Sequence, residues 1–297
     1  MFSKFSPHLL AVLQATLVTF LWSTSWVLIK FGLQDIPALT FAGLRYGLAF
    51  ALLLPFALRA ERLQVIRNLT VGEWVQILGL GCLFYTLTQG AQFVSLFYLP
   101  AITTNLLLSF SGIVVAVLSI FLLQERPSAM QWLGVGCYLC GVLIYFYPVT
   151  IPLSARIGLA VALAGVLANS LSSILGRHVN RSNQLKPIEI TVVSMGFGAF
   201  LLLLSGITLQ GMPKLTWMHW GLILWLAGIN TAFAFTLWNH TLKTLSATES
   251  SILNSLMLIQ IPLLAYLFLN ETVNTRELVG LICAGIGIFI VQLRTDL

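Results

Sequence analysis

The chain has 297 residues, of which 58% are apolar and only 8% are charged, and its mean hydropathy is +0.95. Soluble domains carry about 25% charged residues, so this composition excludes a soluble globular protein and indicates an integral membrane protein. The formal net charge of +6 does not indicate nucleic-acid binding, because the basic residues sit in short loops without interleaved aromatic residues.

Apolar runs of about 20 residues, the length of a membrane-spanning helix, follow one another along the chain. The first run is too long for a signal peptide and lacks a cleavage site, so we expect it to remain as a helix. Ten spans are predicted, at 9–29, 37–58, 73–95, 100–122, 129–147, 155–176, 187–208, 217–240, 247–269 and 275–293.

Several of these spans begin with their own capping signals, in which side chains satisfy the free N–H groups of the first turn. Capping boxes are predicted at Thr70-x-x-Glu73, Ser128-x-x-Gln131 and Ser246-x-x-Glu249, and Asn274-x-x-Glu277 resembles one. Pro100 and Pro187 lie at helix starts, where the N–H group that proline lacks would have had no partner.

The second half of the chain repeats the first at a fixed shift of 146 residues, which places residues 101–145 over 247–291 without a gap. The shift superposes Glu125 on Glu271, and it predicts a duplicated unit, with domains at residues 1–150 and 151–297. Because each unit has five spans, the second enters the membrane from the opposite side. The predicted fold is therefore all-α, with ten transmembrane helices as two inverted five-helix repeats suited to alternating access.

The distribution of lysine and arginine predicts the orientation. With the N-terminus inside, the inner segments hold ten of these residues and the outer segments hold four, while Arg45 lies within the second span. The positive-inside rule therefore places both termini in the cytoplasm.

Two segments carry a family resemblance. Phe121 to Gly134, with Glu125 inside it, and its partner Leu267 to Gly280, around Glu271, resemble the signature of EamA-type transporters of the drug/metabolite transporter superfamily. Leu21 to Leu33 looks like the first helix of that family, and Pro37 followed by Arg45 like its second. The second half departs from the pattern: setting Pro37 over Pro187 lengthens the shift by four residues, and Met195 then stands where Arg45 would repeat.

The resemblance implies an exporter of amino acids, metabolites or drugs in the bacterial inner membrane. It also implies that helices 1, 3, 4, 6, 8 and 9 surround a central cavity, with helices 5 and 10 supporting the fold.

Polar side chains within the spans are candidates for the substrate site, because such groups are costly in lipid. Tyr85, Gln89 and Gln92 share one helical face, which fits either hydrogen bonding between helices or a cavity lining. Asn105 lies on a stripe of small residues that favours close helix packing, although we favour a cavity role for Asn105 itself. The remaining candidates for the cavity are Trp22, Asn169, Asn230, Trp238 and Asn254.

The ionisable residues permit alternative roles. Arg45 could bind a substrate carboxylate, or it could extend to the membrane surface or bind backbone carbonyls. Glu125 and Glu271 are predicted to stabilise the start of the following helix or to act in gating, and Glu249 and Pro262 are further gating or structural candidates. No carboxylate lies at mid-membrane, so uniport or exchange fits better than tight proton coupling.

These features predict a secondary transporter that exports amino acids or related metabolites by alternating access. Its expected partners are a small-molecule substrate and the lipid bilayer, and we expect a monomer or homodimer without a cofactor, metal or nucleic acid. Cys137 and Cys140 form a C-x-x-C pattern inside an apolar helix, where we expect packing residues. A channel and a membrane-embedded enzyme are the alternatives, although no catalytic cluster of histidines and carboxylates is apparent.

Overall fold

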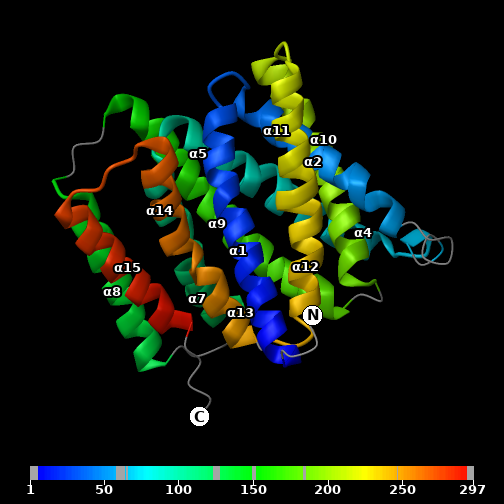
Figure 1. Cartoon of the computed structure of the whole chain (residues 1–297). Helices are drawn as coiled ribbons and strands as arrows, with labels where there is room; N and C mark the ends of the chain where they lie inside the picture. Colours follow the sequence, from blue (N-terminus) through cyan, green and yellow to red (C-terminus); the bar gives the residue numbers. More distant parts are fainter. Residues whose placement is uncertain are drawn as a thin grey trace.

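A computed structural model describes residues 6–57, 64, 66–122, 128–148, 152–182, 185–245 and 247–292. Every regular element in these ranges is helical, and the helices form a single bundle (Figure 1). In chain order they are α1 (Pro7–Gly32), α2 (Ala38–Ala57), α4 (Val71–Gly81), η1 (Cys82–Gln89), α5 (Gly90–Tyr98), α6 (Ala101–Ser109), α7 (Ser111–Leu122), α8 (Ala129–Phe146), α9 (Leu153–Ser182), α10 (Pro187–Gln210), α11 (Trp217–Ala227), η2 (Gly228–Phe233), α12 (Ala234–Thr241), α13 (Ala247–Ser255), α14 (Met257–Leu269) and α15 (Thr275–Gln292).

Eight helical stretches in the described residues are long and apolar enough to cross a membrane. They correspond to the predicted spans other than the fourth and the tenth. The fourth appears as a shorter apolar helix, Ala101–Val115, and the tenth as the 18-residue helix α15. The chain is therefore a multi-pass helical membrane protein.

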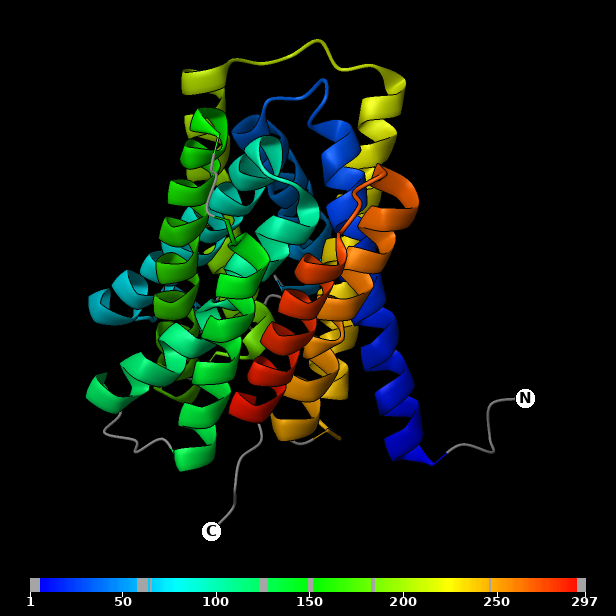
Figure 2. The same ribbon diagram turned by 90° about the vertical axis from the view of Figure 1, so that its left-hand side faces the viewer.

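The beginning of α1 and the end of α15 lie at the same end of the bundle, which we call the terminal end (Figures 1 and 2). The short connection between α1 and α2 and the longer one between α10 and α11 lie at the opposite end, which we call the distal end (Figure 2). This arrangement separates the candidate residues into those near each end and those between them.

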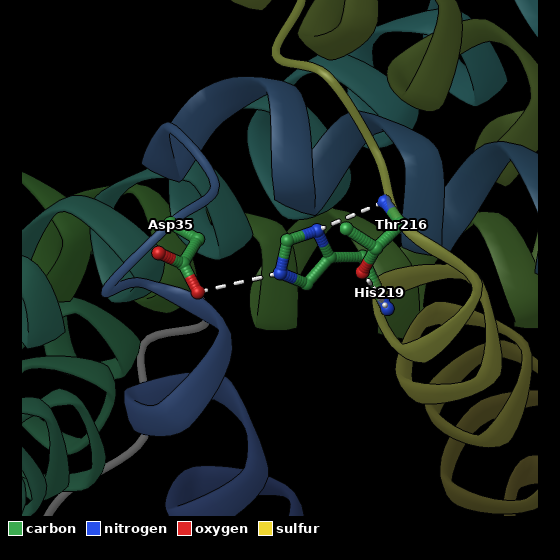
Figure 3. A network of polar contacts seen from close by, with 3 residues as sticks. All are labelled: Asp35, Thr216 and His219. Atoms are coloured by element: carbon green, nitrogen blue, oxygen red, sulfur yellow. Dashed lines mark hydrogen bonds and ion pairs between the residues drawn. The ribbon is translucent and has the colours of Figure 1, made fainter.

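The predicted caps at Thr70 and Ser128 form complete capping boxes. Asn274 and Glu277 exchange two backbone-to-side-chain bonds of 2.9 Å each, whereas Ser246 lies outside the described residues. A further box was missed, because it uses a histidine: Thr216 N–H donates to His219 Nδ1 over 3.2 Å. The other ring nitrogen of His219 lies 3.3 Å from an Asp35 carboxylate oxygen. This contact, drawn in Figure 3, ties the start of α11 to the loop after α1.

Four of the helical passes are interrupted, and the interruptions fall at equivalent places in the two halves. The π-helical segments η1 and η2 begin at Cys82 and Gly228, and the turns between α6 and α7 and between α13 and α14 lie at Phe110 and Leu256. Both pairs are 146 residues apart, which is the shift of the sequence repeat.

The wider π turns leave carbonyl groups for side-chain hydroxyls. Thr88 Oγ1 donates to the Leu83 carbonyl and Thr231 Oγ1 to the Leu226 carbonyl, each over 2.8 Å and each across five residues. Single π turns within α-helices occur frequently at functional sites, so η1 and η2 direct attention to the middle of these two helices.

Glycines allow α8 and α15 to meet backbone against backbone. A Cβ atom on Gly134 would lie 2.8 Å from the Gly287 carbonyl oxygen, and one on Gly141 would lie 2.6 Å from the Gly280 carbonyl oxygen. Residue numbers rise along α8 as they fall along α15, so the two helices are antiparallel. In the sequence repeat Gly134 is equivalent to Gly280, and Gly141 is equivalent to Gly287. The repeat therefore relates the Gly134–Gly287 contact to the Gly141–Gly280 contact.

Candidate functional site

Arg45 lies inside the bundle, where α2 meets α5 and η2. Its side chain is buried, with only 4% of the residue exposed, and therefore does not extend to the membrane surface. Nε donates to Thr231 Oγ1 over 3.0 Å, and the guanidinium carbon lies 5.2 Å from the Tyr46 ring centroid and 5.9 Å from that of Phe93. No carboxylate among the described residues pairs with Arg45.

Tyr46 and Gln89 extend this group of polar side chains. The Tyr46 hydroxyl donates to Gln89 Oε1 over 2.6 Å, and the rings of Tyr46 and Tyr85 meet with centroids 5.6 Å apart. We call Arg45, Tyr46, Tyr85, Gln89 and Thr231 the central cluster. It combines a fixed cation, aromatic faces and one amide, which together suit a ligand with a carboxylate and an apolar portion.

A second group joins α1 to the helix that contains η2. Trp22 packs against Trp238 and Phe235, with ring centroids 5.2 and 5.5 Å apart. Asn230 donates to the Leu21 carbonyl and to Thr24 Oγ1, while its own side-chain oxygen is buried and has no hydrogen-bond partner among the described residues. Asn230 is fully buried, so an unpaired acceptor oxygen here is a rare and costly feature.

Two other predicted amides connect helices of the opposite halves. Asn105 Nδ2 lies 3.5 Å from the Met257 carbonyl, next to the turn that interrupts the ninth pass. Asn169 Nδ2 donates to Ser111 Oγ over 3.0 Å, next to the turn that interrupts the fourth. Both amides therefore hold a neighbouring helix at its interruption.

The remaining candidates are dispersed. Gln92 is partly exposed and makes no side-chain hydrogen bond to a described residue, and Asn254 is exposed on α13. Pro262 lies inside α14, five residues after its start. Glu249 pairs with His8 at the terminal end over 2.7 Å, and Glu125 lies outside the described residues.

Glu271 caps a helix from the other half of the chain. Its carboxylate accepts the N–H groups of Ala101 and Ile102 over 2.6 and 3.0 Å, at the start of α6. The helix that follows Glu271 is α15, which Asn274 and Glu277 already cap, so the partner predicted for Glu271 differs from the one that it has.

Sequence reasoning missed several partners in these contacts. In the sequence Tyr46 and Phe93 are indistinguishable from the other apolar residues of their spans. Their contact with the Arg45 guanidinium is apparent only in the structure. Gln260 is a polar residue in the middle of the ninth span and could have been noticed there: it accepts from Ser23 Oγ over 2.9 Å and joins α14 to α1.

Comparisons with known proteins agree with this architecture. A family model described as the EamA-like transporter family matches residues 9–147 and 156–293, once in each half. The uncharacterized transporter YoaV of Bacillus subtilis (strain 168) is 29% identical over 287 residues, covering 91% of this chain and 92% of that protein. A protein of Salmonella typhimurium named as a probable amino-acid metabolite efflux pump is 25% identical over 297 residues, covering 93% and 92%.

A solved crystal structure that is 18% identical in sequence has the same fold, with a TM-score of 0.64 over 95% of this chain and 96% of the other. The EamA model is matched over almost the whole chain, in a helical bundle whose interruptions recur in both halves. The chain therefore belongs to the EamA-like transporter family.

Proposed function

We propose that this transporter exports amino acids or closely related metabolites, and that Arg45 receives the substrate carboxylate. The observation that carries the proposal is a buried guanidinium that has no carboxylate partner among the described residues. A buried charge without a counter-ion is costly, and an anionic ligand removes that cost. The aromatic rings beside Arg45 provide faces for an apolar side chain. The efflux-pump name of the Salmonella relative supports this substrate class.

The substrate site in this proposal is formed by the central cluster together with the predicted cavity residues. Gln89 and Tyr85 belong to the cluster, while Trp22 and Trp238 form an aromatic wall beside Asn230. Gln92 and Asn254 would contact substrate only in part of the cycle, and Asn105 and Asn169 would hold the interrupted helices. Glu125, Glu249, Glu271 and Pro262 act in gating or support.

Transport proceeds in this proposal by alternating access between two inverted five-helix repeats, residues 1–150 and 151–297. The antiparallel packing of α8 on α15 supports it, because the sequence repeat relates the Gly134–Gly287 contact to the Gly141–Gly280 contact. Such reciprocity is expected of two units related by a two-fold axis in the membrane plane. The paired interruptions in the third and eighth passes, and in the fourth and ninth, provide flexible points in both repeats.

Uniport or exchange accounts for the position of the acidic residues better than tight proton coupling. The described carboxylates lie in first helical turns or connections, and Glu271 is engaged in capping. The proposed location is the bacterial inner membrane with both termini in the cytoplasm, in line with the lysine and arginine bias. The terminal end is then cytoplasmic and the distal end faces outwards.

Counterflow in proteoliposomes tests the proposal. Vesicles loaded with one unlabelled L-amino acid at a time are diluted into the labelled form, and we expect a transient, saturable accumulation for at least one of the twenty common amino acids. A carrier shows this overshoot and an open channel does not. Equilibration without overshoot, at a rate linear in concentration, would contradict the proposal.

A further inference from the structure

A separate cavity lies at the distal end, between α1, α5 and the end of α14. Its volume is about 260 Å³, and it is lined by Lys30, Gln34 and Glu271 together with four apolar residues, among them Leu96 and Phe97. This volume is slightly below the roughly 300 Å³ at which pockets for larger organic ligands begin, so it suits a small metabolite. One cation, one anion and one amide thus share a small, partly apolar space.

The two charged groups in this cavity retain hydrogen-bonding capacity. Lys30 Nζ donates to the carbonyls of Leu96 and Leu99 over 2.6 and 2.7 Å, which leaves one of its three N–H bonds. Each oxygen of Glu271 accepts one backbone N–H group and can accept another hydrogen bond. The ammonium neutralises the C-terminus of α5 and the carboxylate the N-terminus of α6, so both charges are held in place.

Gln34 supplies a third polar group. Its residue is exposed, and its side chain has no hydrogen-bond partner among the described residues. A ligand could therefore engage this amide without breaking an existing contact. The apolar surface next to it, which includes Phe97, is placed to contact a hydrocarbon or aromatic side chain.

We propose that this cavity is a second, outward-facing binding station for a zwitterionic amino acid. The substrate carboxylate binds Lys30 and Gln34, and its ammonium group binds Glu271. This inference rests on the proposed function and assigns it a second site. The two stations are close along α5, because Phe93 contacts Arg45 and Leu96 lines the cavity three residues later, about 4.5 Å further along the helix.

Calorimetric titration of the purified full-length protein in nanodiscs tests the inference. The probes are the twenty common L-amino acids and, for each that binds, its amide, which lacks the carboxylate. We expect two binding events for the native protein. Lys30→Gln should weaken one of them by about 10- to 150-fold, as expected for loss of a charge-assisted bond, and leave the Arg45-dependent event intact. The amide should occupy neither station well.

Two further variants distinguish a loss of amino-acid binding at the second station from a loss of folding. Gln34→Leu removes an amide without a described partner and should weaken the same event by about 2- to 10-fold. Lys214→Gln removes an exposed positive charge in the loop between α10 and α11 and should change neither event. One binding event that depends on Arg45 but not on Lys30 or Gln34 would overturn the second station alone. Absence of binding by every amino acid would overturn both stations.

Discussion

Arg45→Gln is expected to reduce the transport rate of carboxylate-bearing substrates by about 10- to 150-fold at subsaturating concentration. The guanidinium supplies a charge-assisted bond worth about 1.5–3 kcal/mol, and each 1.4 kcal/mol changes the rate or affinity tenfold. The protein should remain folded, because Arg45 has no carboxylate partner among the described residues and its replacement leaves no opposite charge buried and unpaired. The measurement is initial counterflow rate in proteoliposomes, with the amount of folded protein fixed by size-exclusion chromatography.

Thr231→Val is the matched control for this experiment. It removes the hydroxyl that accepts from Arg45 Nε and keeps the charge, so we expect a reduction of only about 2- to 10-fold. The amide of the substrate should be transported equally slowly by the native protein and by Arg45→Gln. If Arg45→Gln transports the acid at the native rate, the guanidinium has a structural role and the carboxylate binds elsewhere.

Gly141→Ala is expected to destabilise the packing of α8 on α15 by about 1–3 kcal/mol or more. The added Cβ would lie 2.4 Å from the Ala284 nitrogen, and this contact is with backbone, which cannot rotate away. Gly287→Ala should behave in the same way, because its Cβ would lie 2.4 Å from the Tyr138 nitrogen. The midpoint of thermal unfolding, followed by tryptophan fluorescence in detergent, measures the loss.

The same two helices provide the controls. A Cβ at Gly136 or at Gly285 meets nothing within 4 Å, so Gly136→Ala and Gly285→Ala should leave the midpoint unchanged or raise it slightly. Equal midpoints for all four variants would show that the close contact between α8 and α15 does not contribute to stability.

Helix positions followed from the sequence because hydropathy reports directly on lipid contact. The first span was expected at residues 9–29 and the helix covers Pro7–Gly32, and the ends at Thr70 and Ser128 were set by their capping boxes. The cap at His219 was missed, since a neutral histidine nitrogen is an unusual acceptor in this position.

The π-helical segments could not have been predicted in this way. Cys82–Gln89 and Gly228–Phe233 lie within longer apolar helical stretches, and a wider turn shifts the helical face without changing the length or composition of the stretch. Thr231, which accepts from Arg45, lies inside the second of these segments, so the central cluster includes a backbone feature that periodicity does not report.

Of the candidate residues, Arg45, Tyr85, Asn105 and Asn230 are buried, whereas Asn254 is exposed, and the partners of the candidates depend on how the helices cross. Asn105 and Asn169 bind helices more than fifty residues away in the chain, and Glu271 caps α6 rather than α15. Such contacts require the three-dimensional arrangement. Lys30 was counted among the basic residues of the outer segments and lies within the Leu21–Leu33 segment that carries the family resemblance. Neither observation predicts its partners, because these are backbone carbonyls that no side-chain pattern reveals.

Accessibility of the predicted cavity residue Gln92 from each side of the membrane tests the account most directly. Gln92→Cys suits the measurement, since Gln92 is partly exposed and makes no side-chain hydrogen bond to a described residue. The variant is made with Cys82, Cys137, Cys140 and Cys283 replaced by alanine, and a membrane-impermeant thiol reagent is applied to right-side-out and inside-out vesicles. An alternating-access carrier should label rapidly from one side, and saturating substrate should move that preference towards the other. Equal labelling from both sides, unaffected by substrate, would contradict alternating access.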